Sequence, residues 1–258
     1  MTPTRVLVPT SLRRRLREAQ RAVARPYLRR RVVRVPMARV ALEVRGARIR
    51  RLRRRGIAVG VERLQGVFVI NLARRPDRLE RIGAELRRMR IDATRFEAID
   101  DPSGIRGCTR SHAALMSTMA ESGWNAIMVC EDDAHFVVDR DELDALVEAF
   151  LADDEAEVAC LGYWHREVER RSLLFMRTTR SFTTSCYLVK ASIASDLRAI
   201  WEEGARELGL GGDREVFGLD HAWVPLQRAR IFLIPIVRAV RQEAGYSDIW
   251  DAEVVPEF

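Results

Sequence analysis

The stretch "AIMVCEDDAHF" (residues 126–136) carries five mostly apolar residues that run directly into three acids, Glu131, Asp132 and Asp133. A short apolar run of this kind predicts a buried strand. Three adjacent carboxylates on a tight loop repel one another, which raises their pKa values unless a cation compensates. Mg²⁺ and Mn²⁺ prefer carboxylate oxygens and share their remaining positions with water and phosphates. The stretch therefore predicts either a divalent-cation site at a strand end or a solvated acidic turn.

Strands and helices alternate on both sides of this stretch. The apolar runs predict strands over 67–72, 93–99, 125–133, 157–164, two within 171–190, and a last one over 231–237. Helical spacing predicts helices over 74–90, 107–123, 140–154 and 191–204, and a loop that enters a short helix over 217–228. This order predicts an α/β fold with an open, mostly parallel sheet flanked by helices.

A second strand end carries polar side chains. Asn71 closes the apolar run "VFVINL", and Arg74, Arg75, Asp77 and Arg78 follow on the loop and first helical turn. Ligands bind outside the carboxyl ends of strands in open α/β sheets. Arginines beside a helix N-terminus suit a diphosphate, although Arg-rich first turns are common in a chain of this composition.

The charge divides the chain. Residues 1–65 hold 20 Arg against three Glu, a net charge of +17, so the remainder carries −10 of the overall +7. We expect an Arg-rich amphipathic or partly disordered extension over 1–65 and one α/β domain over 66–258. The extension has two apolar faces at helical spacing, formed by Leu12, Leu16, Ala19 and Val23 and by Met37, Val40, Ala41 and Val44.

Three interpretations of residues 1–65 stay open. Two helices on an anionic membrane surface would bring the domain to a lipid-linked partner. Nucleic-acid binding is disfavoured, because Tyr27 is the only aromatic residue and no reader motif is visible. The third is a poorly ordered tail or an over-long start, with the true start near Met37.

Cysteine spacing and hydropathy indicate the compartment. The four cysteines form no CxxC pair, which argues against a zinc cluster or a disulfide framework and suits a reducing cytosol. No apolar run approaches 18 residues, and the basic N-terminus lacks the apolar region of a secretory signal. We expect a cytoplasmic protein, peripheral on the inner face of the plasma membrane if the extension binds lipid.

Taken in order, the motifs resemble glycosyltransferase family 25, bacterial lipopolysaccharide galactosyltransferases related to procollagen galactosyltransferases. The resemblance rests on "VFVINLARRPDRLERI" (67–82), "FEAIDD" (96–101) and "GCTRSHAALMSTMAESGWNAIMVCEDDAHF" (107–136). The segments "SCYLVKASIASDL" (185–197), "GLDHAW" (218–223) and "GYSDI" (245–249) fit more loosely. It covers about residues 66–249 and departs from the family pattern at Ala73, Asp101, Thr109 and Arg110.

The resemblance implies a GT-A-like fold and an inverting transfer of a sugar, most often galactose, from a nucleotide sugar such as UDP-galactose. The acceptor would be a hydroxyl of a glycan or lipid-linked molecule in cell-surface polysaccharide or lipopolysaccharide synthesis. Mn²⁺ or Mg²⁺ would be the cofactor. The implied donor-binding residues are Asn71, Arg74, Arg75, Asp77, His112, Glu131 and Asp132. The implied metal ligands are Asp133, Glu131 and His221.

Asp220 is the candidate general base, because it lies in "GLDHAW" as the one later acid followed at once by a histidine. His221 could instead orient Asp220. His112 shares an apolar helix face with Leu115, Met116 and Met119, so a hydrogen-bonded core histidine is the alternative to a site residue. Two other function classes compete: a non-catalytic protein that binds a glycan, nucleotide or nucleic acid on the same fold, and a metal-dependent phosphohydrolase.

Overall fold

An eight-stranded sheet organises the computed structural model, which describes residues 35–249 and 252–255. The strand order is β2-β1-β3-β8-β5-β9-β7-β6. The strands are β1 (Gly66–Asn71), β2 (Thr94–Glu97), β3 (Ala126–Glu131), β5 (Val158–Cys160), β6 (Trp164–Arg170), β7 (Phe175–Phe182), β8 (Cys186–Lys190) and β9 (Phe232–Pro235). Pairings show that β8 and β7 run against the other strands. The expected open, mostly parallel sheet is confirmed.

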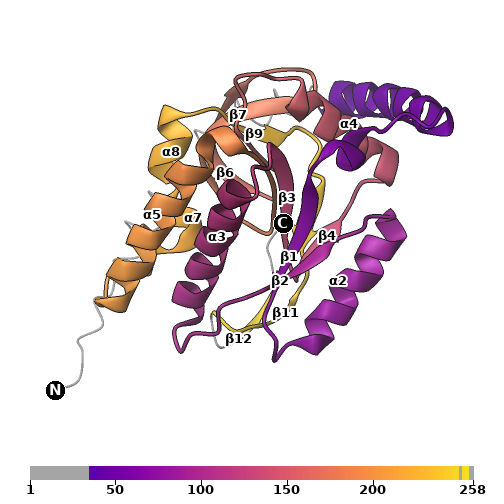
Figure 1. Ribbon diagram of the computed structural model, residues 1–258. Coiled ribbons are helices and arrows are strands. Elements are labelled where there is room, and N and C mark those ends of the chain that lie inside the picture. The colour runs from indigo at the N-terminus through magenta and orange to yellow at the C-terminus, as the bar shows by residue number, and fades with distance from the viewer. Residues whose placement is uncertain (1–34, 250–251, 256–258) are drawn as a thin grey trace, which may run out of the picture.

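Helices cover both faces of the sheet (Figure 1). α3 (Gly104–Glu121) and α5 (Ala191–Gly209) pack against each other on one side, beside the short α6 (Arg214–Phe217), α7 (Leu219–Ala222) and α8 (Val224–Ala229). α2 (Pro76–Met89) and α4 (Arg140–Leu151) lie on the other side. Pro76 begins α2, where its missing N–H would have no helical partner. Within the described residues, no helix has the length and apolar character needed to cross a bilayer.

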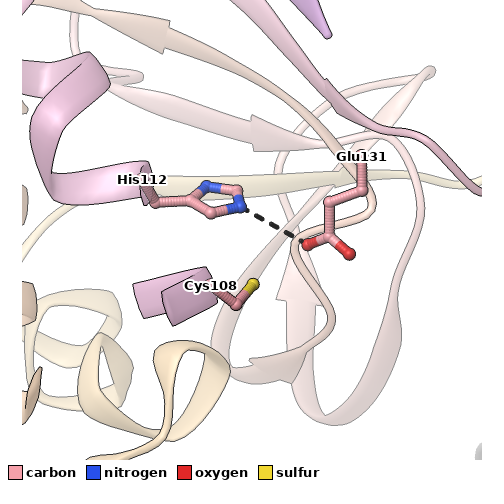
Figure 2. A group of neighbouring side chains, drawn as sticks. All are labelled: Cys108, His112 and Glu131. Atoms are coloured by element: carbon pink, nitrogen blue, oxygen red, sulfur yellow. Dashed lines mark ion pairs between the residues drawn. The ribbon is translucent and has the colours of Figure 1, made fainter. Parts of the chain in front are cut away.

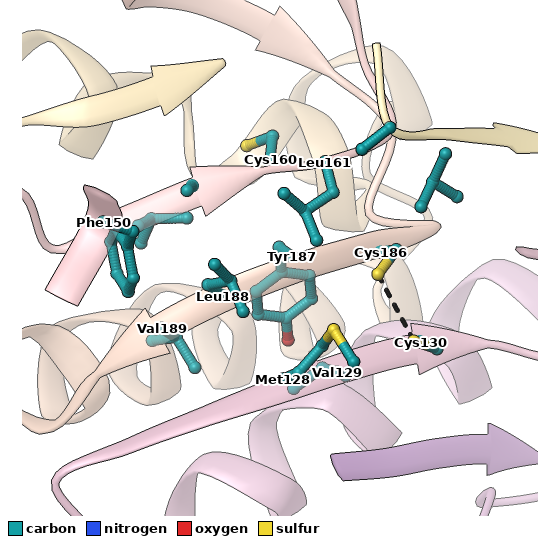
Figure 3. Close-up of a cluster of buried hydrophobic side chains, with 14 of the residues drawn as sticks. Met128, Val129, Cys130, Phe150, Cys160, Leu161, Cys186, Tyr187, Leu188 and Val189 are labelled. Atoms are coloured by element: carbon teal, nitrogen blue, oxygen red, sulfur yellow. Dashed lines mark hydrogen bonds between the residues drawn. The ribbon is translucent and has the colours of Figure 1, made fainter. Parts of the chain in front are cut away.

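The core lies where central strands meet α3, α4 and α5. Strand residues such as Val129, Tyr187 and Leu188 are fully buried and pack as a continuous cluster (Figure 3). Cys130 and Cys186 face each other on β3 and β8, with their sulfur atoms 3.3 Å apart and reduced. Burial of both faces explains why these strands read as unbroken apolar runs rather than alternating ones.

A helix over residues 35–54 packs beside α4 through one face (Figure 1). Ala38, Leu42 and Ile49 on that face join the core. Arg53 forms an ion pair with the fully buried Asp144, which also accepts a hydrogen bond from Val61 N at 2.9 Å. Of the predicted face, Met37, Val40 and Val44 are therefore exposed on the outer side, whereas Ala41 is partly buried against the core. The first expected helix of the extension lies outside the described residues.

The sequence analysis missed several strands. Strand β6 has the sequence WHREVER, and a polar edge strand of this kind lacks the apolar run that identified the others. Short strands β4 (Ala134–Phe136) and β10 (Val240–Gln242) pair with each other, as do β11 (Gly245–Ser247) and β12 (Ala252–Val254). The prediction that 231–237 is the last strand was wrong, because three-residue strands leave no periodic signal.

Candidate functional site

A cavity of about 190 Å³ lies at the carboxyl ends of β1 and β3. These strands are parallel neighbours, with Ile70 opposite Glu131, so the two polar strand ends meet at one edge of the sheet. Four predicted site residues line the cavity: Arg74, Glu131, Asp132 and Asp133. Arg78, Cys108 and the segment around Asp248 also line it.

Asp132 is held by protein partners. Its carboxylate accepts hydrogen bonds from Arg78 Nη1 and Asn71 Nδ2, both at 2.8 Å. Burial raises the pKa of Asp132, and Arg78 opposes that shift. Asn71 is itself buried and also donates to Arg75 O at 3.0 Å, so it joins the two strand ends from behind the cavity.

Glu131 faces α3, the helix that carries Cys108 and His112. Its Oε1 accepts a hydrogen bond from Thr184 Oγ1 at 2.5 Å and lies 3.5 Å from His112 Nε2. Burial acts to raise the pKa of Glu131, but His112 and Thr184 outweigh it and hold that pKa below its ordinary value. Glu131 is therefore ionised in the ordinary pH range.

Asp133 has few partners. Its Oδ2 accepts a hydrogen bond from Gln242 Nε2 at 3.3 Å, whereas its buried Oδ1 has none among the described residues. Burial, together with the charges of Glu131 and Asp132, raises the pKa of Asp133 to about 8. Buried polar groups are normally satisfied, so the free oxygen indicates a missing partner. A hard divalent cation fits this oxygen set.

The Arg-rich loop is tied to the end of the described chain. Arg74 binds Asp248 at 2.6 Å and Asp100 at 3.1 Å, and Arg75 also binds Asp248. Arg78 Nη2 donates to Tyr246 O at 2.6 Å, so the "GYSDI" segment closes over this loop. Asp77 pairs with Arg75 on the surface and lies outside the cavity lining.

His112 and Cys108 lie one helical turn apart on α3 and point toward Glu131 (Figure 2). Cys108 Sγ, His112 Nε2 and a Glu131 oxygen all lie within 4.8 Å of one another. Burial, with the charge of Glu131 next, raises the pKa of the Cys108 thiol well above its ordinary value. Cys108 also lines the cavity.

Asp220 and His221 lie outside the cavity lining, on the short helix α7. Asp220 Oδ2 accepts a hydrogen bond from Thr183 N at 3.3 Å, and Thr183 has a left-handed backbone with φ of 75°. Burial raises the pKa of Asp220, and the charge of Glu131 adds to the shift. The His221 ring packs on Phe182, with centroids 4.7 Å apart.

Three partners of the acids were not predicted from the sequence, Thr183, Thr184 and Gln242, nor was Asp248 predicted as the partner of Arg74 and Arg75. Nothing in the local sequence marks Thr183, Thr184 or Gln242, whereas Asp248 lies in "GYSDI", a segment noted only for its loose fit to the family pattern. Two departures from the family pattern prove to be partners, since Asp101 accepts from Arg110 Nη1 at 3.1 Å. A search for paired departures could have found this contact.

No protein-family model and no curated protein matches the sequence. Among solved structures, mannose-1-phosphate geranyltransferase from Thermus thermophilus is similar at 10% identity and a TM-score of 0.38, over 65% of this chain and 58% of that one. A glycosyltransferase involved in glycosylation of the major capsid of PBCV-1 matches at 7% identity and a TM-score of 0.36, over 67% and 94%. A197 from STIV matches at 12% and 0.35, over 65% and 80%. Similarity at this level assigns no activity to this chain.

Proposed function

We propose that the protein is a metal-dependent glycosyltransferase of the family 25 type, which transfers a sugar from a nucleotide sugar to an acceptor hydroxyl. The observation that carries the proposal is Asp133, a half-buried carboxylate that lines the cavity and whose buried Oδ1 has no partner among the described residues. The sequence order from "INLARRPDR" through "GCTRSH" to "EDD" supports the same reading.

The donor would lie against the carboxyl ends of β1 and β3. Arg74 and Arg78 line the cavity there, and both guanidinium groups suit a diphosphate. Asn71 and Asp132 would act indirectly, since they hold each other and Arg78 in place. UDP-galactose is the first donor to test, on the strength of the sequence resemblance.

Asp133 and Glu131 would hold Mn²⁺ or Mg²⁺ at the inner end of this cavity. When bound, such an ion stabilises the negative charge of the departing diphosphate. The two carboxylates would hold the ion next to Arg74 and Arg78. Positive charges would then gather where the leaving diphosphate develops its negative charge.

Asp220 would remove the proton from the acceptor hydroxyl while the acceptor oxygen bonds to the anomeric carbon and the bond to the diphosphate breaks. Inversion requires the base on the face opposite the leaving group. A raised pKa makes a carboxylate a stronger base, and burial shifts Asp220 in that direction. The acceptor would be a glycan or a lipid-linked molecule of the cell surface.

The test is manganese-dependent hydrolysis or transfer from UDP-sugars by the full chain. Asp133→Asn should lose at least about 100-fold in turnover, in line with removal of one electrostatic contact to the transition state. Asp92→Asn, which changes an exposed acid far from the cavity, is the control. Unchanged turnover in Asp133→Asn would remove the acidic triplet from the mechanism.

A non-catalytic nucleotide- or glycan-binding protein is the alternative. It would show a rise in melting temperature with UDP and Mn²⁺ but no sugar release with any UDP-sugar. Release of phosphate from simple phosphate esters, without a sugar acceptor, would instead favour the phosphohydrolase class. The donor screen therefore separates all three.

We further propose that the helix over 35–54 rests on an anionic membrane surface. Its outer face exposes Met37, Val40 and Val44 at 57%, 58% and 65%. Arg48, Arg51 and Arg55 continue this face toward its C-terminal end. A second copy, or residues 1–34 with 11 Arg and one Glu, would bring Arg against Arg. Anionic lipid complements both the charge and the apolar residues.

Co-sedimentation with vesicles tests this surface. Binding to phosphatidylglycerol vesicles should exceed binding to phosphatidylcholine vesicles, and Val40→Asp with Val44→Asp should reduce it several-fold. Leu210→Asp, which alters an exposed leucine elsewhere, is the matched control. Deleting residues 1–60 is a poor test, because Leu42 and Ile49 belong to the core. Equal sedimentation of all variants would exclude the membrane surface.

A further inference from the structure

The side chains of Cys108, His112 and Glu131 form a compact group that the proposed transfer does not explain. Cys108 and His112 are four residues apart on α3, so they project from the same helix face. Glu131, the last residue of β3, faces them across the space between helix and sheet (Figure 2). The sulfur, the nitrogen and a carboxylate oxygen lie within 4.8 Å of one another.

His112 is held in a ligand-like orientation. Its side chain is fully buried, and its Nδ1 lies 2.9 Å from the Tyr187 hydroxyl oxygen. Nε2 makes no hydrogen bond within the described residues and points at Glu131 Oε1, 3.5 Å away. A partner on one imidazole nitrogen that orients the other is the usual surrounding of a metal-binding histidine. A core histidine would instead satisfy both nitrogens.

Glu131 and Cys108 complete the group from the cavity side. Thr184 Oγ1 bonds Glu131 Oε1 at 2.5 Å and orients the carboxylate. Both Glu131 and Cys108 line the cavity, whereas His112 lies behind them. An ion between the three atoms would therefore be reached from the cavity.

We propose that Cys108 Sγ, His112 Nε2 and the Glu131 carboxylate bind a thiophilic divalent cation such as Zn²⁺, with its fourth position open to the cavity. A thiolate and an imidazole select zinc and cobalt over manganese and magnesium, which prefer oxygen. Three protein ligands with one open position is the arrangement of catalytic zinc sites. As the metal–sulfur bond forms, the Cys108 proton leaves to solvent.

The inference rests on the proposed function in one respect, that the open position takes a phosphate oxygen of the donor. It adds a second position for a cation, because Cys108 and His112 would bind an ion with Glu131, whereas the proposed Mn²⁺ or Mg²⁺ position lies between Glu131 and Asp133. Glu131 belongs to both sets, so the two positions compete for one carboxylate.

Cobalt absorption spectroscopy on the full chain, stripped of metal with a chelator, tests the site. Co²⁺ should bind with one equivalent per chain and produce a thiolate-to-cobalt charge-transfer band together with visible d–d bands. One equivalent of Zn²⁺ should abolish these bands, whereas a large excess of Mn²⁺ should not. Absence of the charge-transfer band when Co²⁺ is bound overturns the proposal.

Variants assign the ligands. Cys108→Ser should lose the charge-transfer band, while Cys160→Ala, which alters a cysteine buried in the core, should keep it. Tyr187→Phe should weaken Co²⁺ binding by about 10-fold or more through loss of the His112 partner. If Cys108→Ser does not fold, His112→Gln serves instead and should weaken binding likewise. A band that persists in folded Cys108→Ser contradicts the site.

UDP-sugar turnover measured on the same samples separates this inference from the proposed function. Turnover without a charge-transfer band would overturn the thiophilic site alone. A band without turnover for any UDP-sugar would overturn the glycosyltransferase alone. An increase in Co²⁺ affinity with UDP present, lost in Cys108→Ser, would support the open position toward a donor phosphate.

Discussion

Asp144, which is fully buried, and Asp133, which is half-buried with a buried Oδ1, are both carboxylates with raised pKa values, yet their surroundings differ. Asp144 lies between α4 and the helix over 35–54, where Arg140, Arg53 and Val61 N all bind it. Asp133 lies at the cavity, where Gln242 provides one long hydrogen bond and Oδ1 has no partner in the described chain. Burial is thus matched by protein partners in one place and not in the other.

The difference separates a structural carboxylate from one available to a ligand. A buried charge is stable only when paired, so Asp144 and its arginines hold the helix over 35–54 to the domain. The backbone of Gly60 also lies against the Asp144 side chain. Gly60 has φ of 61°, and a Cβ at this residue would meet the Asp144 side chain at 2.2 Å. The carboxylate of Asp133, in contrast, destabilises the metal-free fold and is best explained by function.

The largest expected effect is on the structural carboxylate. Asp144→Ala should lower the free energy of unfolding by about 3–5 kcal/mol, because it leaves Arg140 and Arg53 without their buried partner. Denaturant unfolding followed by circular dichroism measures it. Asp154→Ala, at an exposed acid, should change stability by less than about 0.5 kcal/mol. Equal effects of the two substitutions would contradict the role of Asp144.

A smaller effect of opposite sign is expected at Asp133. Its folded pKa of about 8 exceeds the ordinary 3.8, so in the pH range between them the folded state holds a proton that the unfolded state has lost. Stability therefore falls as the pH rises through this window, and the loss is absent below it. Asp133→Asn should remove this fall and be more stable than the parent by at least about 1.4 kcal/mol at pH 8.

The measurement is unfolding of both proteins between about pH 4 and 8 without divalent cations. Asp132 and Asp220 titrate in both proteins, so only the difference reports on Asp133. A difference that stays constant across the window would show that Asp133 does not carry this pH dependence. Mn²⁺ should then stabilise the parent more than Asp133→Asn.

The smallest effect is expected at Asp101, whose surroundings are intermediate between those of Asp144 and Asp133. This buried carboxylate pairs with Arg110, whose side chain is half exposed. A double-mutant cycle of Asp101→Asn and Arg110→Gln should give a coupling energy of about 0.2–1 kcal/mol, as for other solvent-facing ion pairs. A coupling energy well above about 1 kcal/mol would mean that the exposure of Arg110 does not limit the strength of this ion pair.

The sequence predicted most of the sheet but only part of the site. Strands β1, β3 and β9 were evident because both of their faces are buried, which gives unbroken apolar runs. The polar edge strand β6 and the short strands near the chain end have no such signal. At the site, the acids at the strand ends were identifiable, but Thr184, Gln242 and Asp248 come from distant segments whose local sequence says nothing of their partners.

The α/β order, the apolar strands and the placement of Glu131, Asp132 and Asp133 at a strand end can be predicted from the amino-acid sequence, because periodicity and composition are local properties. The folded chain is needed to establish that Asp132 is bound by Arg78, that Asp133 Oδ1 has no partner among the described residues, and that His112 faces Glu131. It is also needed to establish that the helix over 35–54 turns Leu42 inward and Val44 outward. Each of these depends on contacts between residues far apart in the chain, which local sequence patterns do not encode.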